Sequence, residues 1–303
     1  MIFAIPSSAK SGTIAYVRSR QGRDGGYLFY QYDNIFESAV DDTHYALAVL
    51  NWFGVDPPRA DMTLKFLHSK IERTSLQTAY HAVNALHILS GSLHFTHTST
   101  RLSTWLRQEI SNLISNITNS MEVGPQLSTH MSNEIYSIEL PSKLELAYMI
   151  IDLSEKVGLK PFGEEITQEI ARSILNNLKL ESGPNFTAAN ISLAYYGLGV
   201  LRLLNCRFED VKWVGESILK CEDQQGGFNI TPHSRFRTLE YTYEATEALR
   251  WLGLTPRSPR NHARFILGCQ NANGGFRRSL FSGISTLKDT FYAVGALRNL
   301  SLA

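Results

Sequence analysis

The sequence lacks the features that mark several classes of protein. Its 303 residues contain three cysteines, Cys206, Cys221 and Cys269, with no C-x-x-C spacing, so neither a disulfide framework nor a four-thiolate zinc site is expected. The formal net charge is +1 and no long run of like charge occurs, which argues against nucleic-acid binding. No apolar stretch approaches the length of a membrane-spanning helix.

The amino-terminal stretch MIFAIPSSAK holds too short an apolar core for a secretory signal peptide. Because cysteines are also few, the chain is predicted to be cytosolic, and peripheral membrane contact stays open. Hydrophobic residues make up 43% of the sequence and charged residues 19%, as in a globular protein with a generous core.

What the sequence does contain is an internal repeat. Its template is the end of an apolar helix, a polar residue, a Gly-Gly-aromatic turn and a second helix. The turn occurs as YVRSRQGRDGGY (16–27), SILKCEDQQGGF (217–228) and FILGCQNANGGF (265–276). In these copies the polar residue, Gln21, Glu222 or Gln270, precedes the second glycine by five residues.

The helices after the three turns also match one another. They begin with DTHYALAVL at Asp42, YTYEATEAL at Tyr241 and DTFYAVGAL at Asp289. Weaker copies without the turn lie at 78–90 and 193–205. Apolar residues recur at helical spacing in all of these stretches, which predicts an all-helical protein of twelve helices in six pairs.

The predicted helices alternate between an outer and an inner set. The outer helices are expected near 8–20, 58–71, 98–118, 163–179, 208–221 and 257–270. The inner helices are expected near 41–54, 74–90, 142–157, 187–205, 238–253 and 285–300. Gly54 and Gly253 are placed to end two inner helices. The first and last repeats are the best copies, whereas the end repeats of an open solenoid should be atypical, so a closed ring is predicted.

Helix–turn–helix repeats with a Gln…Gly-Gly-aromatic turn resemble the superfamily of squalene cyclases, class II terpene cyclases and protein prenyltransferase β subunits. The resemblance runs from Tyr16 to Leu300 and implies one α6–α6 toroid domain over residues 1–303. The resembled cyclases cover this ring with a second toroid, and the present chain has length for one. A lone ring would need a dimer mate, a helical partner subunit, a membrane surface or its own loops to exclude water. The segment 119–141 is either such a lid or a surface loop.

Protein prenyltransferase β subunits hold zinc through an Asp-x-Cys pair and a His at the starts of two inner helices. Here Thr238 and Glu240 stand at the positions of that pair, and Asp289 stands at the position of the His. Because the thiolate ligand is lost, neither a metal nor another cofactor is expected. Zinc-dependent protein prenylation is therefore the third interpretation of this chain.

The squalene–hopene cyclase branch matches over a longer stretch. Its catalytic segment is similar to GGYLFYQYDNIFESAVDDTHYAL (25–47), in which GGY, YDN and VDDT follow in the family's order. Ala39 departs from the pattern, which has an Asp there. By this resemblance Asp41 is the proton donor, which requires its pKa to be raised by about three units. Asp42 would be the neighbouring carboxylate that helps to raise that pKa.

Alternatives stay open for these side chains. Asp42 occupies the same repeat position as Asp289, which begins another inner helix, so Asp42 is equally a helix-capping residue. His44 lies three residues after Asp41 on the same helical face. There it would relay a proton, or pair with Asp41 and keep that carboxylate ionised.

Aromatic rings are the second requirement of a cyclase, because their faces stabilise carbocations. Core packing is the alternative for most of them. Tyr45 stands where a diphosphate-ionising Asp-Asp-x-x-Asp motif would need an acid, which disfavours metal-dependent ionisation. The candidate substrate-binding rings are Tyr30, Tyr32, Phe36, Tyr45, Tyr243, Phe276, Phe281, Phe291 and Tyr292.

A small basic cluster, His233, Arg235 and Arg237, follows the second Gly-Gly turn and would either hold a diphosphate or lie in solvent. The sequence as a whole favours a cofactor-free class II terpene cyclase that protonates and cyclises a polyprenyl or squalene-type substrate. The alternative is a prenyltransferase β-subunit-like protein that binds an isoprenoid, or a helical partner, without cyclase activity.

Overall fold

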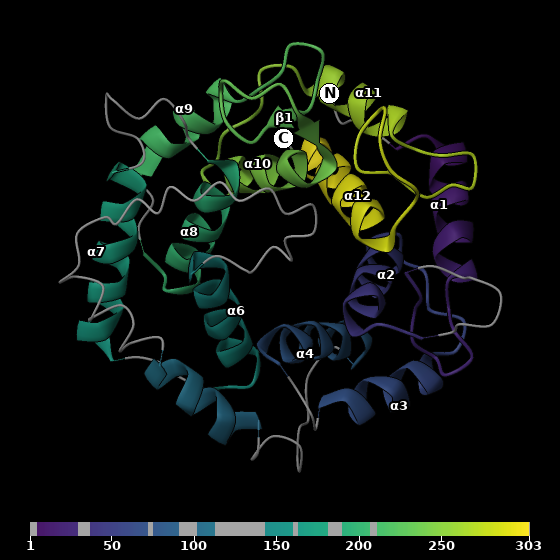
Figure 1. The fold of residues 1–303 in the computed structure, drawn as a ribbon, viewed down its shortest axis with the longest axis horizontal. Coiled ribbons are helices and arrows are strands. Elements are labelled where there is room, and N and C mark those ends of the chain that lie inside the picture. The colour runs from purple at the N-terminus through teal and green to yellow at the C-terminus, as the bar shows by residue number, and fades with distance from the viewer. Residues whose placement is uncertain are drawn as a thin grey trace, which may run out of the picture.

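The chain is known from a computed structural model, which describes residues 5–29, 37–71, 75–90, 102–112, 143–159, 163–180, 190–206 and 211–302. Within these ranges it contains twelve helices in an outer and an inner ring, and one pair of short strands (Figure 1). The outer helices are α1 (Ser7–Ser19), α3 (Ala60–Ile71), a helix over 102–112, α7 (Glu164–Leu180), α9 (Lys212–Lys220) and α11 (Pro259–Gly268). The inner helices are α2 (Val40–Trp52), α4 (Leu76–Ser90), α6 (Lys143–Lys156), α8 (Ile191–Leu203), α10 (Leu239–Trp251) and α12 (Leu287–Leu302).

The inner helices form a closed ring. Each packs against the next one along the chain, and α12 packs against α2, so the last repeat meets the first. The Gln270 side-chain amide strengthens this junction, since it donates to the Ala9 carbonyl and to the Thr13 hydroxyl of α1 at 3.1 Å each. The predicted all-α toroid of outer and inner helices is therefore confirmed.

The ends of several elements differ from the predicted ones for local reasons. Helix α8 begins at Ile191, because the Asn190 side chain caps it and accepts from the Ser192 N–H at 3.0 Å. Helix α11 begins at Pro259, whose fixed φ suits the first helical position.

Two features next to α10 show what the pattern could and could not predict. The predicted stop at Gly253 is confirmed, since this residue follows α10 with a φ of 67°, as Gly54 does after α2. The antiparallel strands β1 (Phe228–Asn229) and β2 (Arg237–Thr238) were not predicted. Strands of two residues are too short to show an alternating pattern.

The three Gly-Gly-aromatic turns share one hydrogen-bonded arrangement. In each, the N–H of the aromatic residue donates to a threonine hydroxyl in the first turn of the next inner helix. These bonds join Tyr27 to Thr43 at 2.9 Å, Phe228 to Thr242 at 3.1 Å and Phe276 to Thr290 at 3.1 Å. The three aromatic side chains are fully buried. Thr43 of the VDDT stretch therefore has the same structural role as Thr242 and Thr290 in the other two repeats.

The polar residue before each turn binds the next outer helix. The Gln21 amide donates to the Thr63 hydroxyl of α3 at 3.0 Å, as Gln270 does to α1. In the second copy the pair is replaced by Glu222 and His262 of α11, with 2.9 Å between Glu222 Oε1 and His262 Nε2. The repeat therefore keeps the contact while its chemistry changes from amide and hydroxyl to carboxylate and imidazole.

Replacing Gly274 with alanine is expected to lower the free energy of unfolding by about 3 kcal/mol. Gly274 has a φ of +87°, and a Cβ there would lie 2.1 Å from the Gly12 carbonyl oxygen of α1, at the junction of the first and last repeats. Urea unfolding would measure the loss. Gly163→Ala is the matched control, because nothing lies within 4 Å of its Cβ position. Equal stability of the two variants would contradict the role given to this junction.

Candidate functional site

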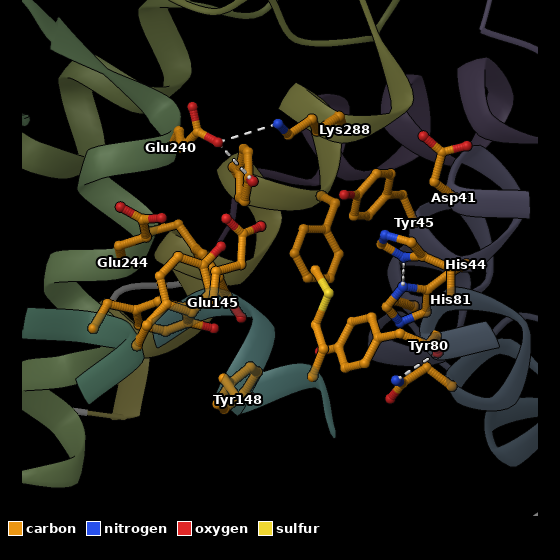
Figure 2. A pocket seen from close by; sticks show the side chains of 18 of the residues that line it. Asp41, His44, Tyr45, Tyr80, His81, Glu145, Tyr148, Glu240, Glu244 and Lys288 are labelled. Atoms are coloured by element: carbon orange, nitrogen blue, oxygen red, sulfur yellow. Dashed lines mark hydrogen bonds and ion pairs between the residues drawn. The ribbon is translucent and has the colours of Figure 1, made fainter. Parts of the chain in front are cut away.

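A cavity of about 870 Å³ lies inside the inner ring, and all six inner helices contribute to its lining (Figure 2). Each inner helix presents an aromatic ring at the same repeat position, and we call these six residues the aromatic belt. The aromatic belt consists of His44, Tyr80, Tyr148, Tyr195, Tyr243 and Phe291. Neighbouring members, including His44 and Phe291 at the junction of the ring, have centroids 5.3 to 6.4 Å apart. The cavity is therefore encircled by a continuous band of rings.

Glycines in two inner helices make room for the aromatic belt. A Cβ at Gly199 of α8 would lie 2.7 Å from the Tyr148 ring, and one at Gly295 of α12 would lie 2.7 Å from the Tyr243 ring. Each tyrosine therefore packs directly against the backbone of the neighbouring helix. This explains why small residues alternate with aromatic ones in the inner helices.

The position after each belt residue also faces the cavity. Its occupants are Tyr45, His81, Met149, Tyr196, Glu244 and Tyr292. Tyr45 packs on the belt, with its ring centroid 5.1 Å from that of Phe291. One member of this second layer, Glu244, carries a carboxyl group in a layer that is otherwise mostly aromatic.

Glu244 is the most deeply buried acid of the cavity wall. Its side chain is 3% exposed, and the Ser192 hydroxyl donates to its Oε2 at 2.7 Å. Burial, followed by the nearby Glu240 carboxylate, raises the pKa of Glu244 to about 8. This carboxyl group therefore keeps its proton at neutral pH while it faces the cavity.

Three further acids line the cavity from the first turns of their helices: Asp41 of α2, Glu145 of α6 and Glu240 of α10. Glu240 accepts from the Tyr292 hydroxyl at 2.9 Å and forms an ion pair with Lys288 at 3.2 Å (Figure 2). The acids from α6 and α10 lie across the cavity from Asp41 in Figure 2. Acidic groups therefore surround the aromatic interior on more than one side.

Opposite Glu240, two histidines form a neutral pair. His44 Nδ1 and His81 Nδ1 are 3.0 Å apart, so one ring donates to the other (Figure 2). Burial lowers the pKa of His44, and the neighbouring His81 adds to this effect. Burial likewise lowers the pKa of His81 to about 4, although Asp41 opposes the shift. Of the two roles predicted for His44, pairing with Asp41 is replaced here by pairing with His81.

The histidine pair makes the free energy of unfolding depend on pH in the acidic range. The unfolded chain binds a proton at His81 near pH 6.5, while the folded chain does so near pH 4, so stability is lost as pH falls through this window. We expect wild type to lose about 3 kcal/mol relative to His81→Gln between pH 7 and pH 4. Glutamine can still accept or donate at His44. Urea unfolding at several pH values would test this, and parallel curves for the two proteins would contradict it.

The two aspartates predicted as catalytic lie on different sides of α2. Asp41 lines the cavity but its side chain is exposed. Asp42 is 4% exposed, and burial, together with Asp41, raises its pKa to about 7 against the effect of Arg20. It is not among the residues that line the cavity. Of the two acids, Asp41 faces the cavity and is exposed, whereas Asp42 is buried and does not face it. The catalytic roles given to them stay predictions.

The predicted aromatic residues divide into three groups. Tyr45, Tyr243, Phe291 and Tyr292 line the cavity. Two others need correction: Phe276 is a core residue with 1% exposure, held by its turn, and Phe281 lies at the surface with 95% exposure. Tyr30, Tyr32, Phe36 and the segment 119–141 lie outside the described residues.

Sequence reasoning missed Tyr80, Tyr148, Tyr195 and Glu244 as cavity residues. A signal for them was present, because alignment of the six inner helices puts all of them in the two columns that hold His44, Phe291 and their neighbours. Glu244 was unusual, because it is the only acidic residue in these two columns. The repeats without a Gly-Gly turn therefore indicate cavity residues as clearly as the three repeats that have one.

The residues at the zinc-binding positions of the resembled prenyltransferases do not fit a zinc ion. Thr238 caps α10, with its hydroxyl accepting from the Tyr241 N–H at 3.2 Å. Asp289 accepts from the Thr286 hydroxyl at 2.7 Å. Among the described residues, no three His, Cys, Asp or Glu side chains are grouped to hold a metal ion. Thr238 and Asp289 therefore serve the starts of α10 and α12.

Comparisons with known proteins agree with the fold. Residues 167–302 match the family model described as prenyltransferase alpha-alpha toroid domain. A chain in the structure titled "Candida albicans protein geranylgeranyltransferase-I complexed with GGPP" is similar, with a TM-score of 0.61 and 14% identity, over 98% of this chain and 87% of that chain. At that identity the likeness concerns the fold alone. No curated protein matches the sequence. The described helices include none long and apolar enough to cross a membrane.

Proposed function

We propose that the central cavity binds an isoprenoid chain. The observation that carries this proposal is the closed aromatic belt, because aromatic rings offer a large area of apolar contact to a hydrocarbon chain. The volume of about 870 Å³ is within the range of small-molecule sites. The similar geranylgeranyltransferase-I chain belongs to a structure complexed with GGPP, which supports an isoprenoid as the class of ligand.

The charges of the cavity favour an isoprenoid without a diphosphate. Its described lining includes Asp41, Glu145, Glu240 and Glu244, two lysines and no arginine. Both lysines have acidic neighbours: Lys288 pairs with Glu240, and Lys156 pairs with Asp152. A diphosphate would meet carboxylates rather than the arginine and lysine side chains that usually hold phosphate. A neutral polyprene or polyprenyl alcohol suits the cavity better.

Titration of the purified chain with geranylgeraniol and squalene would test this function. Trp52 lines the cavity beside the belt, so we expect its fluorescence to be quenched with a dissociation constant in the micromolar range or below, about −8 kcal/mol or tighter. The quench should shrink in Trp52→Phe while calorimetric binding persists. Absence of saturable binding to any chain length would contradict the proposal.

A second candidate function, acid-initiated cyclisation, is favoured by the proton that Glu244 retains at the cavity wall. In this reaction the Glu244 proton would add to one carbon of an alkene, and the alkene electrons would form the new C–H bond. The resulting carbocation would be attacked by a second alkene of the same chain, which closes a ring. Return of a proton from the cyclic cation to the Glu244 carboxylate would regenerate the acid and restore the charge balance. The aromatic belt would stabilise the positive charge between these steps.

Two variants separate this candidate from the one based on Asp41. The wild-type chain would be incubated with squalene and geranylgeraniol, and cyclic products would be measured by mass spectrometry. We expect Glu244→Gln to lower product formation at least about 100-fold, while Asp41→Asn keeps most of it. The opposite result would restore Asp41 as the donor. Tight binding without products from wild type would leave isoprenoid binding as the function and exclude cyclisation of these substrates.

A further inference from the structure

A second hollow of about 620 Å³ lies on the outer part of the toroid, away from the central cavity. It is lined by the second Gly-Gly turn, the strands β1 and β2 with the loop between them, α11, and the turn at 279–282. We call it the rim groove. None of its lining residues belongs to the central cavity.

The floor of the rim groove contains a hydrogen-bond acceptor without a donor. Asn229 of β1 is 7% exposed, and its Oδ1 has no hydrogen-bond partner. Its backbone is fixed, because its N–H donates to the Cys221 carbonyl at 3.0 Å and it pairs with Arg237 of β2. Buried polar atoms in folded proteins nearly always have a partner. The position therefore suits a ligand that brings an N–H or O–H donor.

The walls of the rim groove carry exposed aromatic side chains. Phe236 is 50% exposed and Phe281 is 95% exposed, and both line the groove. The turn that carries Phe281 is held by a bridge between Ser279 and Ser282, so this ring stands out on an ordered segment. Exposed rings beside a hollow are typical of surfaces that bind a partner.

The exposed charged side chains that line the groove without an ion-pair partner among the described residues are basic. Arg237 is paired with Asp223. The buried Glu222 carboxylate is bonded to His262 Nε2 and accepts from the N–H groups of Arg257 and Ser258. Lys220 and Arg235 also line the groove, are exposed, and have no ion-pair partner among the described residues. The sequence predicts the cluster of His233, Arg235 and Arg237 to be a diphosphate site or solvated surface. In the structure its Arg235 has no ion-pair partner among the described residues and lines the groove with Phe236 and Phe281.

We propose that the rim groove binds an extended acidic peptide segment of a partner protein. An apolar side chain of the segment packs on Phe236 and Phe281, a carboxylate pairs with Arg235 and Lys220, and a backbone N–H donates to Asn229 Oδ1. A lipid surface fits less well, because phosphate and ester groups supply acceptors and leave the Asn229 acceptor without a donor. This site is independent of what the central cavity binds.

Selection from a random-peptide library on the intact chain, followed by fluorescence anisotropy with the enriched peptides, tests the proposal. We expect the enriched peptides to place a large apolar residue beside aspartate or glutamate. Phe281→Ser and Arg235→Glu should each weaken their binding at least about tenfold, and Asn229→Leu should weaken it about fivefold. Phe29→Ser is the matched control, because Phe29 is an exposed phenylalanine after another Gly-Gly turn, and it should leave affinity within about twofold.

Three results would overturn the proposal. The first is a selection that enriches no peptide, and the second is enrichment of peptides whose binding does not depend on Arg235. The third is binding of phosphatidylserine vesicles, or of ATP, that requires Phe281 and Arg235 while no acidic peptide competes. Such a result would assign the groove to a membrane surface or to a nucleotide. Circular dichroism of each exposed-residue variant would show that the fold is kept.

Discussion

Replacing Glu244 with glutamine is expected to raise stability at alkaline pH by about 4 kcal/mol relative to wild type. In the folded chain the pKa of Glu244 is raised from 4.5 to about 8 by burial and by Glu240. The stability that its proton provides is complete below pH 4.5 and is lost as pH rises through 8, because the unfolded chain gives up this proton earlier. Glutamine is neutral throughout and can still accept from Ser192.

Urea unfolding of wild type and Glu244→Gln between pH 4 and pH 9 measures this effect. The two proteins should be about equally stable at pH 4, and their curves should separate as pH rises. Glu216→Gln, which removes an exposed carboxylate of α9, is the control and should follow wild type. Curves of Glu244→Gln and wild type that stay parallel to pH 9 would show that Glu244 is ionised in the fold, and the acid role proposed for it would fail.

Truncating one ring of the aromatic belt is expected to remove most of the affinity for an isoprenoid. Tyr148→Ala should raise the dissociation constant of geranylgeraniol about 30-fold, which corresponds to about 2 kcal/mol of lost apolar contact. Tyr148 is suited to this test because it joins the belt between Tyr80 and Tyr195, at centroid distances of 6.4 and 6.1 Å.

Tyr148→Phe is the matched control for this experiment. It keeps the ring and removes the hydroxyl, so affinity should stay within about threefold of wild type if ring contact is what binds the ligand. Unfolding of both variants should be followed in parallel, since the ligand must be tested on folded protein. A loss of affinity in Tyr148→Phe as large as in Tyr148→Ala would assign binding to the hydroxyl and would contradict an apolar ligand.

The repeat allowed the fold to be predicted because equivalent residues make the same structural contacts in each copy. The polar residue before each turn binds the next outer helix, and the threonine after it accepts from the turn, as Gln21 and Thr43 show. The same regularity gives part of the VDDT stretch a structural explanation, while Asp41 as proton donor stays a prediction. The VDDT stretch matched a catalytic motif, yet Thr43 serves the turn and Asp42 is buried away from the cavity.

The burial of Glu244 could not be predicted from its own repeat, although alignment of the six inner helices indicates that it faces the cavity. Glu244 is 3% exposed and bonded to Ser192 of α8, which belongs to another repeat. Its neighbours in the chain give no sign of this. The strands β1 and β2 lie within one repeat and escaped prediction because each is only two residues long. The rim groove escaped prediction because it combines these strands with α11 and the turn at 279–282, which belong to the next repeat.

The central claim is that the cavity binds an uncharged isoprenoid more tightly than the same isoprenoid with a diphosphate. The most direct test is to compare geranylgeraniol with geranylgeranyl diphosphate on the same preparation by calorimetry at low salt. The alcohol should bind at least about tenfold more tightly, because carboxylates repel the diphosphate, and Glu240→Gln, which frees Lys288 from its ion pair, should narrow the difference. A diphosphate that binds as tightly as the alcohol, or more tightly, would contradict the account.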